Sequence, residues 1–413
     1  MTDTVNQLIS YGLHSSSSNW TTTPTMINVR LADNNHLWPK PEYNKITRSG
    51  VIPDTNDPVA GLRGPKNMLL GDVSMECDGL SSSGAGDGVA ASSLSTTLES
   101  AYEALFGVAH DSSTGELTDA TEAGTGTSLI MASSSVNAAT DWVLAQNLSE
   151  GYYLARQIES VSTDTLTVCR GPTTIDGNAD GWNESQTAYG ALDWYTSNTT
   201  PNHKHMGWKV EHVGGYEGQF NGCFPMSAGW SLAVGDVLKF NMGGMTATTW
   251  TKQAAQGGSY SAPTSGNKIV CTPIYFYIGS ALYMAHDISI DLGLQVAPRP
   301  ANQTEANMYG HVVVRMAPTI SATITYGDIS TPQEATNSLV DTWQAATAAN
   351  SSYTADVLIQ AGNRPGGTAA WRAEALDFTD VQHVDVNGME GVRITGTCTE
   401  ASGAQGVLAH AIF

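Results

Sequence analysis

The sequence of 413 residues is poor in charge, and above all in positive charge. Only 14% of its residues are Asp, Glu, Lys or Arg, compared with about 25% in typical soluble domains. Eighteen residues are basic and 39 are acidic, so the formal net charge is −21. This shortage excludes non-specific binding of nucleic acid through a basic face, because such binding neutralises phosphates. It also argues against binding to an anionic membrane surface.

Long hydrophobic runs are missing as well. The longest apolar run, residues 274–285, covers 12 positions and is too short to span a bilayer. The first residues contain neither the basic nor the apolar stretch of a signal peptide. The five cysteines are scattered, and no two have the spacing of zinc ligands. These features predict reduced, buried thiols in a protein made in a cytoplasm.

Motifs of known active sites are also absent. The chain has no G-x-S-x-G, H-E-x-x-H, Walker or G-x-G-x-x-G motif. Carboxylate pairs such as Asp287 with Asp291 occur, but a chain with 39 acidic residues offers many such pairs by chance. We therefore expect no catalytic residues, no cofactor and no enzymatic activity.

One short pattern resembles a metal-binding loop. Asp176, Asn178 and Asp180 follow the first half of a calcium loop, in which alternate oxygens face one cation, and Glu184 offers a further carboxylate. The last position of such a loop requires Glu, whereas Thr187 stands there. An ordinary turn is therefore the favoured interpretation.

Three histidines form a second pattern with metal-ligand spacing. His203 and His205 would lie on one face of a strand, and His212 follows. No cysteine or carboxylate partner stands at close spacing. Polar histidines leading into a strand are therefore favoured over a metal site.

Charge is distributed unevenly along the chain. Residues 1–70 carry a net charge of +1, residues 71–200 carry −16 and residues 201–413 carry −6. This distribution serves solubility, or it allows the N-terminal segment to dock on an acidic neighbour. The candidate assembly residues in that segment are Arg30, Lys40, Lys45, Arg48, Arg63 and Lys66.

The pattern of apolar residues predicts a β-dominated α+β fold. Many short alternating runs indicate strands. Two helices are expected: residues 94–106, with a stripe of Leu94, Leu98, Ala101 and Leu105 ended by Gly107, and residues 333–348, with a stripe of Ala335, Leu339, Trp343 and Ala346.

Four segments follow from this pattern. Residues 1–70 read as an extended arm with one strand at residues 26–31. Residues 71–111 hold a strand and a helix, and the strand-rich residues 205–413 continue the same domain. The Ser, Thr and Gly-rich residues 112–204 read as an inserted small all-β domain.

A cluster of aromatic residues suggests an alternative function. Exposed Trp and Tyr rings bind sugars in carbohydrate-binding and adhesin modules, although the same residues also anchor sheet cores and subunit interfaces. The cluster consists of Trp182, Trp194, Tyr195, Trp208, Tyr216 and Trp230.

Several segments resemble those of the major tail tube proteins of long-tailed bacteriophages. The strand Gly71-Asp-Val-Ser-Met-Glu76 leads into the helix Leu98-Glu-Ser-Ala-Tyr-Glu-Ala-Leu-Phe-Gly107. After the insertion come Tyr216-Glu-Gly-Gln-Phe-Asn-Gly-Cys223, the run from Trp230 to Met245, and Asp287-Ile-Ser-Ile-Asp-Leu292. The resemblance covers residues 40–110 and 205–413, and the insertion departs from the shorter chains common in that family.

The resemblance implies a β-barrel or sandwich with one or two flanking helices. Copies would form a ring, and rings would stack into a tube that conducts double-stranded DNA without binding it specifically. A hexameric ring and a trimer of pseudo-repeats both remain open, and the lack of a clear internal repeat favours one barrel per chain. The implied partners are further copies, the tail terminator, the tape measure and the distal tail protein, with no membrane.

The same resemblance implies a place in the virion tail, after assembly in the cytoplasm of a host bacterium. An acidic lumen would repel phosphate and keep the DNA sliding. The candidate acidic residues of the tube domain are Asp72, Glu76, Asp78, Asp287 and Asp291.

Overall fold

A computed structural model gives the fold. It describes residues 7–14, 24–29, 31, 40–43, 65–80, 97–107, 121–123, 126–131, 141–174, 178–184, 186, 188–196, 202–212, 216–254, 267–300, 308–325, 332–386, 388–400 and 407–413. The fold is β-dominated α+β, as expected, and includes a sheet curled into a half barrel. Two helices and four sheets make up the regular structure of the described residues.

The largest sheet has 13 strands. Eleven follow in the order β18-β17-β23-β24-β25-β22-β19-β14-β15-β4-β3, while β26 pairs with β24 and β11 pairs with β26. The strands are β3 (Lys40–Tyr43), β4 (Pro65–Glu76), β11 (Leu192–Tyr195), β14 (Ser227–Ala233), β15 (Lys239–Ala247), β17 (Ile274–Ile278), β18 (Ala281–Tyr283), β19 (Ala285–Asp291), β22 (Thr319–Thr325), β23 (Thr354–Ala361), β24 (Ala369–Val386), β25 (Met389–Thr399) and β26 (Ala409–Ile412).

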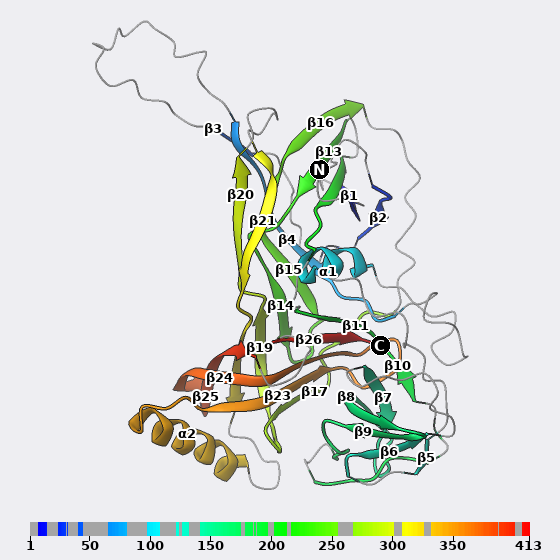
Figure 1. Cartoon of the computed structure of the whole chain (residues 1–413), viewed down its shortest axis with the longest axis vertical. Helices are drawn as coiled ribbons and strands as arrows, with labels where there is room; N and C mark the ends of the chain where they lie inside the picture. The colour runs from blue at the N-terminus through cyan, green and yellow to red at the C-terminus, as the bar shows by residue number, and fades with distance from the viewer. Residues whose placement is uncertain are drawn as a thin grey trace, which may run out of the picture.

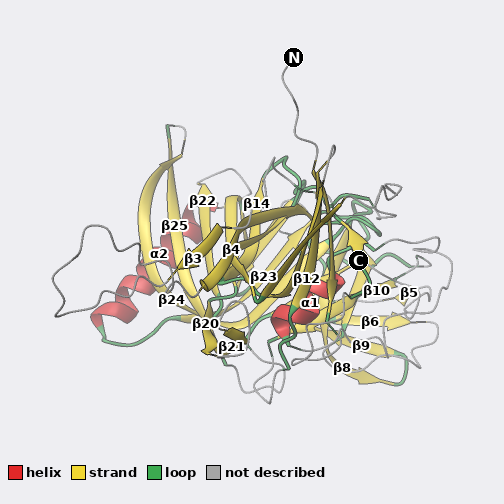
Figure 2. Ribbon diagram, turned by 90° about the horizontal axis from the view of Figure 1, so that it is seen from above, coloured by secondary structure: helices red, strands yellow, loops and turns green. Residues whose placement is uncertain are grey.

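The strands of this sheet turn steadily about one another. In Figure 1, β14 and β15 run steeply while β23 and β24 lie nearly across them, and Figure 2 shows the strands as an arc seen from above. Right-handed strand twist and β-bulges both bend sheets. The register shifts between β15 and β4, between β19 and β22 and between β24 and β25.

A second sheet has five strands in the order β16-β13-β12-β1-β2. Its strands are β1 (Gln7–Leu13), β2 (Ile27–Asn28), β12 (Met206–His212), β13 (Tyr216–Cys223) and β16 (Thr249–Ala254). The separate hairpin of β20 (Leu294–Pro300) and β21 (Met308–Met316) stands beside it.

The strand β1 corrects the expectation that residues 1–70 form an extended arm. It lies between β12 and β2 in the five-stranded sheet, and the side chains of Ile9 and Tyr11 are buried. Tyr11 stacks on Trp208 of β12 with ring centroids 5.0 Å apart. Burial of these rings fixes the segment in the core. The strand expected at residues 26–31 is reduced to Ile27–Asn28.

The first helix lies between the large sheet and the five-stranded sheet. It is α1 (Glu99–Phe106), and Gly107 ends it in the left-handed conformation at φ 74°, where a residue without Cβ is favoured. Leu98, Ala101 and Leu105 of the expected stripe are buried, whereas Leu94 lies outside the described residues.

An aromatic cluster forms the centre of the core around α1. Tyr102 contacts Trp194, Trp230, Phe240 and His410, with ring centroids 4.9 to 5.7 Å apart. All five side chains are essentially inaccessible to solvent. They come from the helix and from four strands of the large sheet, so this cluster ties α1 to that sheet.

The second helix, α2 (Pro332–Ala348), begins one residue before the expected start. Leu339 is buried, and Trp343 and Ala346 are half-buried. The indole N–H of Trp343 donates to the carbonyl oxygen of Phe378 on β24 at 3.2 Å. The remaining described side chains of the helix beyond residue 340 are exposed, so it is held along one edge and protrudes (Figure 1).

The third sheet has six strands in the order β10-β7-β8-β9-β6-β5. Its strands are β5 (Thr121–Ala123), β6 (Ser128–Met131), β7 (Trp142–Gln146), β8 (Tyr153–Ser162), β9 (Thr165–Val168) and β10 (Tyr189–Gly190). They all fall within the predicted insertion, residues 112–204. The next strand, β11, also falls in that range but pairs with β26 of the large sheet.

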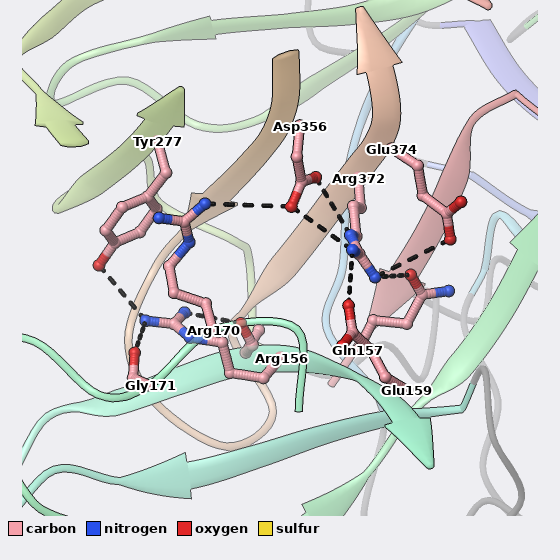
Figure 3. Close-up of polar contacts among 10 residues, drawn as sticks. Arg156, Gln157, Glu159, Arg170, Gly171, Tyr277, Asp356, Arg372 and Glu374 are labelled. Atoms are coloured by element: carbon pink, nitrogen blue, oxygen red, sulfur yellow. Dashed lines mark hydrogen bonds and ion pairs between the residues drawn. The ribbon is translucent and has the colours of Figure 1, made fainter. Parts of the chain in front are cut away.

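The six-stranded sheet shares its core with the large sheet. Leu144 and Leu154 belong to one buried cluster with Tyr277, Leu358 and Phe413. The polar edge of the contact is shown in Figure 3, where Arg372 of β24 donates to Asp356 of β23 and reaches across to β8. There it donates to Gln157 and Glu159, both at 3.0 Å.

Two further arginines complete this contact. The guanidinium groups of Arg156 and Arg170 lie 5.2 and 4.7 Å from the ring centroid of Tyr277, a cation–π arrangement. Arg156 is fully buried and donates to the carbonyl oxygens of Ala155 and Gly171. The residues predicted to form an inserted small all-β domain are therefore packed against the large sheet through a shared apolar cluster and through charged contacts.

Candidate functional site

One face of the large sheet is polar over six adjacent strands. Opposite residues on β4, β15, β14, β19, β22 and β25 form rows that cross the sheet. One row is Glu76, Lys239, Ser231, Ser289, Ser321 and Thr395. The next is Ser74, Asn241, Gly229, Asp291, Thr319 and Thr397. We call the side carrying these rows the polar sheet face.

The reverse face of the same strands is apolar. The intervening rows are Met75, Phe240, Trp230, Ile290 and Ile320, then Leu232, Ile288, Ala322 and Ile394. Successive side chains of a strand point to opposite faces, so alternation within each strand builds both faces at once. The apolar face is buried against α1 and the five-stranded sheet.

Hydrogen bonds between neighbouring strands connect the polar sheet face. The hydroxyl of Ser74 donates to the Asn241 side chain at 2.6 Å, and the amide of Asn241 donates to Ser231 at 3.1 Å. Further along, Ser321 and Thr395 hydroxyls lie 3.1 Å apart. These side chains are held in place by one another. Ser74 is buried, whereas the other four are half-buried and present hydroxyl and amide groups at the surface of the face.

Four of the five acidic residues expected in the tube domain lie on this face. Asp72, Asp287 and Asp291 are exposed, and Glu76 is partly exposed and paired with Lys268. Asp72 accepts the Gly244 N–H at 2.8 Å. Asp291 likewise accepts the Gly293 N–H at 2.6 Å.

Asp78, the fifth expected residue, does not lie on the face. Its side chain is 1% exposed and accepts a hydrogen bond from the Thr97 hydroxyl. It follows the end of β4 and bridges to Lys268 through the backbone. Because the strand has ended, the alternation that places Asp72 and Glu76 outward no longer applies.

The polar sheet face contains a hollow of about 340 Å³. It crosses four strands, and Asp72 and Asp291 stand at its two sides. Gly229 and Gly243 line it without side chains; a Cβ at Gly229 would lie 2.2 Å from the carbonyl oxygen of Ile290. Close approach of the neighbouring strand therefore requires glycine here.

The candidate assembly residues fall mostly outside the described residues. Lys40 lies in β3 and Lys66 lies in β4, at the edge of the large sheet where these strands pair. The other four expected residues lie outside the described part of the chain: Arg30, Lys45, Arg48 and Arg63.

Part of the calcium-loop candidate belongs to a hydrogen-bonded turn. Asp180 accepts bonds from the backbone and hydroxyl of Ser149 and from the Gly181 N–H. Burial raises the pKa of Asp180, but the three hydrogen bonds together outweigh burial and hold this pKa below its usual value. Asn178 and Glu184 are exposed, and Asp176 lies outside the described residues.

The histidines of the second metal pattern are separated by the fold. His205 is buried beside His311, whereas the ring of His203 lies near the Ala104 carbonyl oxygen. Burial lowers the pKa of both His203 and His205. Among the residues that the structure describes, no three His, Cys, Asp or Glu side chains converge as metal ligands.

The aromatic cluster taken as a possible sugar-binding surface is largely a set of core residues. Trp182, Trp194, Trp208 and Trp230 are at most 2% exposed. Indole rings bind sugars only when they form an accessible platform, and the strands here turn these rings inward. The expectation of an exposed aromatic surface is therefore wrong for these four residues.

The hydroxyl rows are the part of this site that the sequence analysis missed. The sequence patterns identified acidic residues as site candidates. They did not identify the hydroxyl residues Ser231, Ser289, Ser321 and Thr395. A usable signal existed in the strict alternation of residues 319–325, where Thr and Ser alternate with Ile and Ala.

Comparison with protein-family models found no match for this chain, and a search of curated proteins found no significant match. Neither described helix is long and apolar enough to cross a bilayer.

Proposed function

We propose that this chain is a structural protein of a bacteriophage tail that assembles into stacked rings around a channel for double-stranded DNA. The polar sheet face lines the channel in this arrangement, and the apolar face packs outward against α1 and the five-stranded sheet. The protein is a virion component without catalytic activity. Copies of the same chain are its principal partners.

The polar sheet face is the observation that carries this proposal. A DNA channel has to stay hydrated and must not hold phosphate. The face offers neutral hydroxyl and amide groups together with Asp72, Asp287 and Asp291, which repel phosphate. Its basic residues are few: Lys239 pairs with Asp236 at 3.4 Å, and Arg393 stands beside Thr323.

The open ends of the large sheet also support self-assembly. Within the described residues, its terminal strands β3 and β18 each pair on one side. Unpaired edges invite pairing with another chain. A closed ring of copies joined through such edges leaves no edge exposed, and closed symmetry is the usual form of homo-oligomers. The sugar-binding alternative lacks comparable support because its Trp residues are buried.

Thiol labelling tests which face lines the channel. We expect Ser289→Cys, on the exposed polar sheet face, to react with a small maleimide in both monomers and assembled particles. A maleimide carrying a large polymer should react with the monomer and be excluded from the channel of assembled particles.

Thr347→Cys is the matched control. Thr347 is exposed on α2, whose Trp343 packs against the apolar core cluster that contains Phe378 and donates to the Phe378 carbonyl oxygen. The native cysteines are free; four are buried and Cys169 is partly exposed, so the wild-type chain supplies the background. The proposal fails if the polymer reagent labels assembled Ser289→Cys as fast as the monomer.

A further inference from the structure

Three buried histidines meet where the β20–β21 hairpin contacts the five-stranded sheet. His14 follows β1, His205 precedes β12 and His311 lies in β21, and all three are at most 7% exposed. The rings of His205 and His311 are 5.8 Å apart, and both contact Phe224. Elements distant in the sequence are thus joined through imidazole rings.

Two of these rings act as hydrogen-bond acceptors for backbone N–H groups. The His311 N–H donates to Nε2 of His205 at 2.8 Å, which ties the hairpin to the start of β12. The Gly222 N–H donates to Nε2 of His14 at 3.3 Å, which ties β13 to the end of β1. An imidazole nitrogen accepts only through its lone pair. Protonation at Nε2 therefore converts each bond into a contact between two donors.

Further contacts bind the same groups together. The His14 N–H donates to the His205 carbonyl oxygen at 2.9 Å. Nε2 of His311 lies 2.7 Å from the Thr246 hydroxyl of β15, so the hairpin is also tied to the large sheet. Apolar side chains of the hairpin, Leu294 and Val313 among them, also pack against the core.

The charged and titratable groups around His205 all disfavour its protonation. Each neighbouring group is either positively charged or becomes so when it is protonated. These groups are His311, His14, Arg299 of β20 and His203. Burial is the largest influence and, with these neighbours, lowers the pKa of His205 to about 3. Burial alone lowers the pKa of His311 to about 4. Both rings are neutral at pH 7 in the closed arrangement.

We propose that His205 and His311 form an acid-sensitive latch, in which protonation of these imidazoles releases the β20–β21 hairpin from the start of β12 and from β15. The latch closes when the rings are neutral. On opening, each ring reaches water and regains the ordinary affinity of histidine for a proton. Acid therefore favours the open arrangement. This device is independent of the proposed assembly into a tube.

Hydrogen exchange of the β21 amides, corrected for the intrinsic effect of pH, measures the latch. Between pH 7.5 and pH 5, the population of the open arrangement should rise about 30-fold for each imidazole that protonates on opening, given a free-histidine pKa of about 6.5. His205→Gln should abolish most of this rise, because the Gln oxygen accepts the His311 N–H and does not titrate. His205→Phe, which has no acceptor, should exchange quickly at both pH 7.5 and pH 5.

His383→Gln is the matched control, because His383 is a half-exposed histidine on β24; it should keep the wild-type profile. If His205→Gln fails to fold, as judged by circular dichroism, His311→Gln provides a second test, because it removes the titrating ring that contacts the Thr246 hydroxyl. The proposal is overturned if the Gln variants keep the wild-type pH profile. It is equally overturned if the amides of β21 and β22 lose protection together as the pH falls.

Discussion

Gln360 is the side chain whose removal should most directly separate the six-stranded sheet from the large sheet. It is fully buried on β23. Its side-chain oxygen accepts the Ala155 N–H at 2.8 Å, and its amide donates to the carbonyl oxygens of Tyr153 at 2.9 Å and Gly362 at 2.8 Å. One side chain thus bonds to the backbone of β8 at both Tyr153 and Ala155.

The change Gln360→Leu keeps the volume and removes all three bonds. It leaves the buried Ala155 N–H and the Tyr153 carbonyl oxygen without this partner, at about 1–3 kcal/mol for each buried group. The added apolar surface offsets about 1 kcal/mol. The free energy of unfolding should therefore fall by about 1–5 kcal/mol.

Urea unfolding and hydrogen exchange check this prediction. The Ala155 amide should lose protection in the variant while the amides of β14 and β19 keep theirs. Gln382→Leu is the matched control, because Gln382 is exposed and bonds only to Asp380 among the contacts described for it; its effect should stay within about 0.5 kcal/mol. A Gln360→Leu protein that loses less than about 1 kcal/mol and keeps Ala155 protected would refute the reasoning.

Three further predictions concern charge, pH and backbone. Asp287→Lys with Asp291→Lys should create salt-sensitive DNA binding on the polar sheet face, with a log–log salt slope of about −2; a gel-shift titration in which wild type and variant behave alike contradicts it. Burial lowers the pKa of His410 to about 3, so its contribution to stability is complete above pH 6.5 and is lost as the pH falls. Between pH 6.5 and 4, the free energy of unfolding of His410→Phe should therefore fall less steeply than that of the wild type, by about 1.4 kcal/mol per pH unit. Urea titrations that give the same slope for both proteins would exclude this. Gly293→Ala should lower the melting temperature far more than Gly279→Ala, because both have positive φ but only the first Cβ would meet a carbonyl oxygen, at 1.9 Å; equal shifts would show that the clash is relieved.

Local patterns predicted much of the secondary structure. Leu98, Ala101 and Leu105 recur with helical spacing, and Gly107 supplies the left-handed ending, so α1 was predictable except at its start. Residues 319–325 alternate strictly and form β22 as expected. In these segments the propensity, the periodicity and the capping residue agree, and tertiary contacts reinforce the same choice.

The missed features depend on contacts between distant segments. β1 has a weak pattern, with Ser10 and Gly12 among its apolar residues, and it exists because Tyr11 packs on Trp208 almost 200 positions away. The same holds for Trp194, whose ring contacts Tyr102 of α1 and His410 of β26 and is inaccessible to solvent. The register between strands cannot be read from the sequence. The acidic residues of the polar sheet face could therefore be predicted, but their alignment with the hydroxyl rows could not.

Electron microscopy of the purified 413-residue chain at increasing concentration tests its assembly into rings. We expect rings or hollow tubes in which the polar sheet face surrounds the channel. Particles that remain monomeric at every concentration, with the fold intact by circular dichroism, would contradict it.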